Sequence, residues 1–198
     1  MCPACARAAS WRNCLRASSV LTAFLLLACF TAAQAADRKE WQRLSCDYVP
    51  HANNDGDSFR VRCGGDEFVL RLYFVDTPET NLLYPERTRE QAEHFGATLD
   101  DTLKAGAKAR AYVRDALRGP FIVTTRKASA PGRARDPRFY GMVEVGGKGL
   151  DEMLVLQGLA RPKGVVASLP GETSRAHARR LQLLEEQAKQ KGRGLWKK

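Results

Sequence analysis

The amino-acid sequence predicts an α+β domain with five short strands and several helices. Three short segments rich in β-branched and aromatic residues come first, as expected for consecutive strands. Segments with helical periodicity follow the third strand and also end the chain. No internal repeat and no change of composition divides residues 36–198, so these residues are predicted to form a single domain.

The five strands are predicted from alternating side chains and from the turn residues beside them. Gly, Pro or Asn residues border each segment, and the third segment alternates most clearly. The predicted strands are residues 42–50, 58–63, 67–75, 121–126 and 139–145. A five-stranded barrel of the OB type with added helices is one fold that suits this order, although periodicity alone does not select it.

Four helices are predicted, at residues 86–95, 103–117, 150–159 and 174–189. Gly96, Gly119 and Gly192 end three of them. The run from Ala128 to Pro137 is rich in Pro, Gly and Arg and predicts a basic loop. Small or apolar residues mark the expected buried faces of the two long helices, namely Ala107, Ala111, Val113 and Leu117 in one and Ala178, Leu181, Leu184 and Ala188 in the other.

Residues 1–35 are expected to be a signal peptide. Three arginines precede an apolar run, Val20 to Phe30, that is shorter than the roughly 20 residues of a membrane-spanning helix. Ala33-Gln34-Ala35 fits a signal-peptidase site, so the protein is expected to be exported and to be periplasmic or secreted. An alternative stays open, because Leu26 to Cys29 resembles a lipoprotein box; cleavage before Cys29 would give a lipid-anchored envelope protein.

The charge and the cysteines of residues 36–198 indicate a partner and a disulfide. The chain has a net charge of +10 and stays basic without the leader, which suits a polyanionic partner such as nucleic acid. Charge alone leaves a merely solvated basic surface as an equal alternative. Four of the six cysteines lie in the leader. Cys46 and Cys63 are left, on either side of a turn at Gly56, and in an exported protein they are expected to form one disulfide.

Two acidic segments lie where predicted strands meet turns. Asp55-Gly56-Asp57 precedes the second strand and Asp76-Thr77-Pro78-Glu79 follows the third, and each alone is typical of a turn. Antiparallel pairing would place Asp57 and Asp76 at the same edge of the sheet, where carboxylates can bind a hard divalent cation. The histidines show no ligand spacing and are expected at the surface: His51, His94 and His177.

Arg71 lies in the apolar run from Leu70 to Val75. A guanidinium there needs a carboxylate, a phosphate or solvent, so Arg71 is either a structural ion-pair residue or a functional one. In a flat, regular strand its side chain would lie on the face opposite to that of Asp76. Strand twist or a bulge would be needed to bring the two together.

These motifs occur in an order that resembles the staphylococcal nuclease (thermonuclease) family. The matching blocks are Asp55 to Ser58, Arg71 to Glu79, Arg138 to Val143, Gly147-Lys148 and Leu154 to Ala160. The resemblance covers roughly residues 44–196. It implies the OB-type barrel and an exported bacterial member of the family.

The resemblance also implies a calcium-dependent phosphodiesterase that cuts DNA and RNA with little sequence preference and needs no stable protein partner. Asp57 and Asp76 would bind Ca²⁺ with the carbonyl oxygen of Thr77. Glu79 takes the position of the general base, since an ionised carboxylate can activate water. The two family arginines that hold the phosphate match Arg71 and Arg138, and a guanidinium can bind two phosphate oxygens at once.

The chain departs from the family pattern beside Arg138. Asp136-Pro137 replaces a Tyr-Gly pair, which removes a tyrosine that contacts phosphate, and Tyr140 is a candidate substitute. The charge of Asp136 is unfavourable near phosphate unless Arg133 or Arg135 pairs with it.

The alternative function is a non-catalytic OB-type module that binds single-stranded nucleic acid. In the nuclease, bases would rest on an aromatic side chain such as that of Tyr84 or Tyr140. A second departure from the family, a longer segment between Glu79 and Gly106, either shapes the cleft or is a surface loop. The carboxylates favour the enzyme, because a pure binder has no need of metal ligands.

Overall fold

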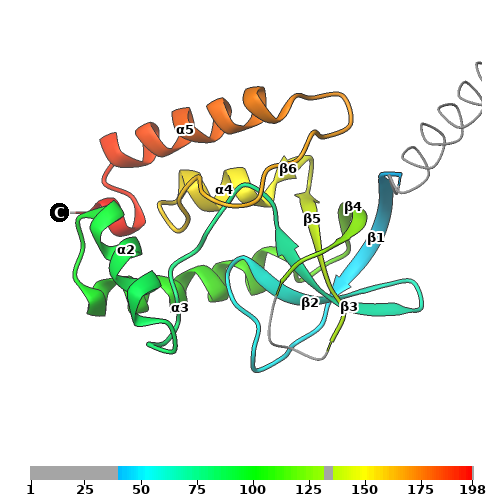
Figure 1. Ribbon diagram of the computed structural model, residues 1–198, viewed down its shortest axis with the longest axis horizontal. Coiled ribbons are helices and arrows are strands. Elements are labelled where there is room, and N and C mark those ends of the chain that lie inside the picture. Colours follow the sequence, from blue (N-terminus) through cyan, green and yellow to red (C-terminus); the bar gives the residue numbers. More distant parts are fainter. Residues whose placement is uncertain (1–39, 132–135, 198) are drawn as a thin grey trace, which may run out of the picture. The chain divides into compact units, whose positions relative to one another are not determined.

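The computed structural model describes residues 40–131 and 136–197, which belong to one compact unit (Figure 1). The predicted signal peptide and lipoprotein box, and residues 132–135 of the predicted basic loop, lie outside these ranges. No helix within them is long and apolar enough to cross a lipid bilayer.

Five strands form a closed barrel, which confirms the α+β fold of the OB type. Antiparallel pairs join β2 to β1, β2 to β3, β1 to β4 and β4 to β5, and a parallel pairing of β3 with β5 closes the ring. The short β6 extends the sheet beyond β5. The strands are β1 (Gln42–Tyr48), β2 (Ser58–Cys63), β3 (Asp66–Leu72), β4 (Phe121–Ser129), β5 (Arg138–Val145) and β6 (Lys148–Gly149).

The barrel interior is filled by alternate side chains of the strands, as expected for a sheet with one buried face. The buried residues are Phe59 and Val61 of β2, Phe68, Leu70 and Leu72 of β3, Phe121 and Val123 of β4, and Val143 of β5. Cys46 of β1 lies opposite Cys63 of β2, with a Cα–Cα distance of 4.2 Å, and the predicted disulfide between them is confirmed. This bond fixes the hairpin whose connecting loop contains the first acidic segment.

Four α-helices in the described ranges pack beside the barrel (Figure 1). The hydroxyl of Thr98 accepts a hydrogen bond from the amide of Asp101, at 3.1 Å, and so caps the start of α3. Gly96, with φ of 63°, ends α2 in the left-handed conformation that glycine adopts at little cost. The helices are α2 (Pro85–Phe95), α3 (Leu99–Ala116), α4 (Leu150–Leu156) and α5 (Ser174–Gln190), followed by the 3₁₀ helix η1 (Gly194–Trp196).

Two sequence predictions about β3 and α3 were wrong in part. β3 ends at Leu72 rather than at residue 75, because the backbone turns at Phe74, whose φ is 64°. In α3, Val113 is buried as predicted, but Ala107 is exposed. The buried face of α3 instead carries mainly small or polar residues, which a hydrophobicity pattern does not identify: Thr102, Ala105, Gly106, Ala109 and Val113.

The prediction that His177 lies at the surface was also wrong, since it is 3% exposed and lies on the buried face of α5. Its Nε2 is 2.6 Å from Asp151 Oδ2 on α4, and its Nδ1 is 3.1 Å from Glu172 Oε2. Burial lowers the pKa of His177, but the hydrogen bonds to these two carboxylates outweigh burial and raise it above its usual value. The ion pairs therefore join α5 to α4. Leu181 and Ala188 are buried as predicted.

Candidate functional site

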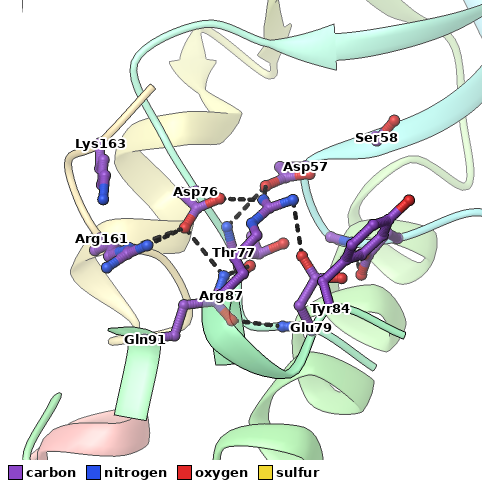
Figure 2. Close-up of polar contacts among 12 residues, drawn as sticks. Asp57, Ser58, Asp76, Thr77, Glu79, Tyr84, Arg87, Gln91, Arg161 and Lys163 are labelled. Carbon is purple, nitrogen blue, oxygen red and sulfur yellow. Dashed lines mark hydrogen bonds and ion pairs between the residues drawn. The ribbon is translucent and has the colours of Figure 1, made fainter. Parts of the chain in front are cut away.

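The two acidic segments meet at one end of the barrel. Asp57 directly precedes β2, and its carbonyl accepts a hydrogen bond of 2.9 Å from the amide of Leu72 at the end of β3. Beyond the turn at Phe74, the backbone of Asp76 pairs with that of Arg161 through hydrogen bonds of 3.0 and 3.1 Å. Asp57 and Asp76 are both buried, and they lie in one network of polar contacts (Figure 2). The predicted meeting of these residues is therefore observed.

Arg71 joins the two carboxylates. Its Nη1 donates to Asp57 Oδ1, and its Nη2 lies 3.4 Å from Asp76 Oδ1. The turn at Phe74 returns the chain to the side on which Arg71 lies, which a flat strand would not do. The guanidinium is thus paired and also lines two cavities, so both roles considered for Arg71 are compatible with its position.

Thr77 and Glu79 complete the acidic segment. The amide of Thr77 donates to Asp57 Oδ2 at 2.8 Å, and its carbonyl accepts from Gln91 Nε2 at 2.9 Å. Glu79 is 8% exposed. Burial raises the pKa of Glu79 despite the nearby positive charge of Arg87, and repulsion by Asp57 and Asp76 raises it further. Glu79 is therefore a stronger base than an exposed glutamate.

Three residues that the sequence did not single out support these groups (Figure 2). Gln91 of α2 is fully buried and donates to Asp76 Oδ2 at 3.0 Å while it accepts from the amide of Glu79 at 2.9 Å. Arg161 is 3% exposed, and its Nε donates to Asp76 Oδ2 at 2.8 Å. Arg87 and Gln91 are four residues apart, so they share one face of α2, and this spacing was the signal available in the sequence.

Arg87 contacts several acids at once. Its Nη1 lies 2.9 Å from Glu79 Oε1, and its Nη2 contacts Asp76 Oδ1 and lies 4.0 Å from Asp57 Oδ2. Its side chain is 36% exposed, far more than those of Arg71 and Arg161. The segment between Glu79 and Gly106, which is longer than in the family pattern, therefore contributes the charged side chain of Arg87 to the site.

Arg138 of β5 lies beside Arg71, since the parallel pairing places Arg138 opposite Val69 and Arg71 opposite Tyr140. Its Nη1 donates to the carbonyl of Pro131 at 2.7 Å, but its Nε is buried without a hydrogen-bond partner. Burial and the positive charge of Arg71 lower the pKa of Arg138. The two guanidinium groups therefore form a positively charged place in which an anion would be stabilised.

The charge of Asp136 is paired with an arginine that the sequence did not single out. Its carboxylate pairs with Arg60 of β2, which also lies 3.2 Å from Glu67. Arg133 and Arg135, the partners proposed from the sequence, lie outside the described residues. Because Arg60 holds Asp136, the acid does not need Arg138 as its partner.

Two cavities flank the arginines. One, of about 790 Å³, is lined by Asp55, Arg60 and Tyr84 among others, and the second, of about 410 Å³, by Tyr140, Arg161 and Lys163. They share four lining residues, Arg71, Arg87, Pro131 and Arg138. A chain-like anion could therefore contact the arginines while its two sides extend into different cavities. The two candidate stacking residues, Tyr84 and Tyr140, line different cavities.

The expected ligand atoms of Asp57, Asp76 and Thr77 suit a hard divalent cation, since all are carboxylate or carbonyl oxygens. Burial is the main cause that raises the pKa of the nearby Asp55 to about 7, and repulsion by the Asp57 carboxylate raises it further. Within residues 40–131 and 136–197, no three His, Cys, Asp or Glu side chains have the arrangement of a metal site. The expected set has only two such side chains and a carbonyl. Guanidinium groups contact both carboxylates, so a cation could bind these oxygens only after those groups move.

The closed barrel and its cleft of carboxylate and guanidinium groups define a protein of the nuclease or nucleic-acid-binding class. A family model described as staphylococcal nuclease homologue matches residues 69–198, so the chain belongs to this family, whose members are generally nucleases. The matched range includes Arg71, Asp76, Glu79 and Arg138, whereas Asp57 precedes it. No curated protein matches the chain.

Proposed function

We propose that the protein is a nuclease that hydrolyses phosphodiester bonds in DNA and RNA, with Ca²⁺ as cofactor and with low sequence specificity. The main support is the pair formed by Arg71 and Arg138, in which a buried guanidinium nitrogen has no partner beside a cluster of carboxylates. A protein that only binds nucleic acid would gain nothing from those carboxylates, because they repel phosphate.

In this proposal, Asp57, Asp76 and the carbonyl of Thr77 hold the cation. When bound, the ion supplies positive charge that stabilises the charge gathering on the phosphate oxygens. The amide hydrogen bond from Thr77 to Asp57 and the contacts of Gln91 with Asp76 keep these oxygens oriented. Such preorganisation reduces the cost of assembling the site during the reaction.

The chemical roles follow from the positions of the remaining residues. Arg71 and Arg138 bind the reacting phosphate from two neighbouring strands, and the unpaired Nε of Arg138 gains an acceptor. Glu79 orients the attacking water and takes its proton, for which a raised pKa is favourable. Because these contacts are with phosphate and not with base edges, the enzyme is expected to accept most sequences.

We also propose that the protein acts after export, in the periplasm or outside the cell. The disulfide between Cys46 and Cys63 supports an oxidising compartment. Mass spectrometry of the mature N-terminus tests this proposal. A terminus near Ala36 is expected, a lipidated Cys29 would support the lipoprotein alternative, and an uncut leader would contradict export.

Digestion of plasmid DNA and of RNA by the purified protein, with Ca²⁺, Mg²⁺ or a chelator, tests the function. We expect cleavage with Ca²⁺, none in chelator, and a rate lower by about 10²–10⁴-fold in Glu79→Gln. Glu186→Gln is the matched control, since Glu186 is exposed on α5, lines neither cavity and pairs with Lys189 at 3.0 Å. Activity that persists in chelator would reject the metal, and tight binding without cleavage would favour the non-catalytic module.

A further inference from the structure

Arg87 is the one arginine in the described part of the chain that contacts the carboxylates of both Asp76 and Glu79 and also approaches Asp57. These are the acids at which the proposed cation would bind or act. A carboxylate lone pair that accepts a guanidinium hydrogen bond is not free to bind a metal ion. Arg87 and a cation therefore compete for the same oxygens.

The other two arginines of this network are held more firmly than Arg87. Arg161 is 4% exposed at its side chain, its backbone pairs with Asp76, and its Nη1 lies 3.3 Å from the carbonyl of Glu90. Arg71 is 16% exposed and lies within β3. With 36% of its side chain exposed, Arg87 can exchange its carboxylate contacts for water at the lowest cost.

The backbone around Arg87 also favours its release. Arg87 is in the first turn of α2, which begins at Pro85. The unpaired amides of a helix N-terminus carry partial positive charge, which disfavours a cation at this position. The carboxylates of Asp76 and Glu79 therefore hold the guanidinium against this local repulsion. A divalent cation bound to those acids would neutralise the charge that attracts Arg87.

We propose that Arg87 is an internal counter-ion: it neutralises the acidic site while the divalent cation is absent and is displaced when the cation binds, so that it lowers the affinity for the cation. The proposal rests on the proposed Ca²⁺ site. Arg87 lines both cavities beside Arg71 and Arg138, so the released guanidinium remains in the cleft. Loss of the competing charge should strengthen cation binding, because a hydrogen bond between charged groups no longer has to be broken.

Calorimetric titration with Ca²⁺ of the wild-type protein, Arg87→Gln and Arg89→Gln tests this inference. Gln keeps a polar side chain but removes the charge. We expect Arg87→Gln to bind Ca²⁺ about tenfold more tightly or better, which corresponds to the strength of one charged hydrogen bond. Arg89→Gln is the control, since Arg89 lies on the same helix and pairs with the exposed Glu86 at 2.8 Å, and its affinity should not change. Equal or weaker binding by Arg87→Gln would overturn the proposal.

Thermal unfolding gives a second measurement that does not depend on activity. In chelator, Arg87→Gln should have a lower Tm than the wild type, because its acids have lost a counter-charge, and Ca²⁺ should raise its Tm more. If this variant does not fold even with Ca²⁺, Arg87→Lys replaces it and should also bind the ion more tightly than the wild type, since a lysine forms no paired hydrogen bonds. No Ca²⁺ binding by any variant would reject both the cation site and the role of Arg87, whereas binding without cleavage would reject only the nuclease.

Discussion

Gly106 of α3 lies directly against the backbone that carries the proposed base. A Cβ atom at this position would lie 2.3 Å from the carbonyl oxygen of Glu79 and 2.6 Å from that of Pro78. Since carbon–oxygen contacts are rarely shorter than about 3.3 Å, Gly106→Ala must move α3 and the acidic segment apart by roughly 1 Å. Both contacts are with backbone carbonyl groups, which cannot rotate away as the end of a flexible side chain could.

The expected cost of Gly106→Ala combines two opposing effects. Overpacking costs about 1–3 kcal/mol, and replacement of glycine by alanine within a helix returns about 1 kcal/mol. The free energy of unfolding should therefore fall by about 0–2 kcal/mol, or up to about 8 °C in Tm for a domain of this size. Displacement of Glu79 by about 1 Å should lower the rate of cleavage by about 100-fold.

Thermal unfolding and plasmid cleavage measure the two effects of Gly106→Ala separately. Gly119→Ala is the matched control, because a Cβ there meets no heavy atom within 4 Å, and it should keep full activity. A Gly106→Ala protein with a raised Tm and full activity would refute the reasoning, since α3 would then have room for the methyl group.

Three further outcomes are expected. Reduction of the disulfide, whose cysteines are 17 residues apart, should remove about 3 kcal/mol and lower the Tm by about 6–12 °C, and an unchanged Tm would contradict this. Arg161→Met removes a buried counter-charge from Asp76 and should cost about 3 kcal/mol in urea unfolding, whereas a neutral result would mean that the other arginines suffice. His177→Gln should cost more stability at pH 6 than at pH 9: because the pKa of His177 is raised above 6.5, its charged form stabilises the fold below that pH and is lost as the pH rises through the raised value. An equal cost at both pH values would reject the ion pairs with Asp151.

The meeting of Asp57 and Asp76 could be predicted because it depends on local order in the sequence. A turn, two antiparallel strands and a second turn place the ends of the strands together whatever the rest of the chain does. The disulfide could be predicted for the same reason, since Cys46 and Cys63 lie opposite each other in one hairpin. Strand register is thus sufficient for these two features.

The contributions of Arg87, Gln91 and His177 depend on how helices pack, so the spacing that places Arg87 and Gln91 on one face of α2 was not enough to identify them. Gln91 and Arg87 lie on a polar helix whose inner face combines apolar residues with polar contacts to the acidic segment. The carboxylates that bind His177 come from α4 and from the loop before α5, and no spacing links the three residues in the sequence. Buried polar networks replace apolar contacts in both places, so a hydrophobic pattern is misleading there.

The parallel pairing of β3 with β5 brings Arg71 and Arg138 together, so the proposed site is complete only when the barrel closes. Arg71 and Arg138 lie on these two strands, and α2, α3 and β4 separate them along the chain. We expect contacts between such distant segments to form late, because the intervening chain must be ordered before they are gained. A chain in which the barrel has not closed has no paired guanidinium groups, so cleavage activity should recover during refolding only with the final closure and never from a partly folded state.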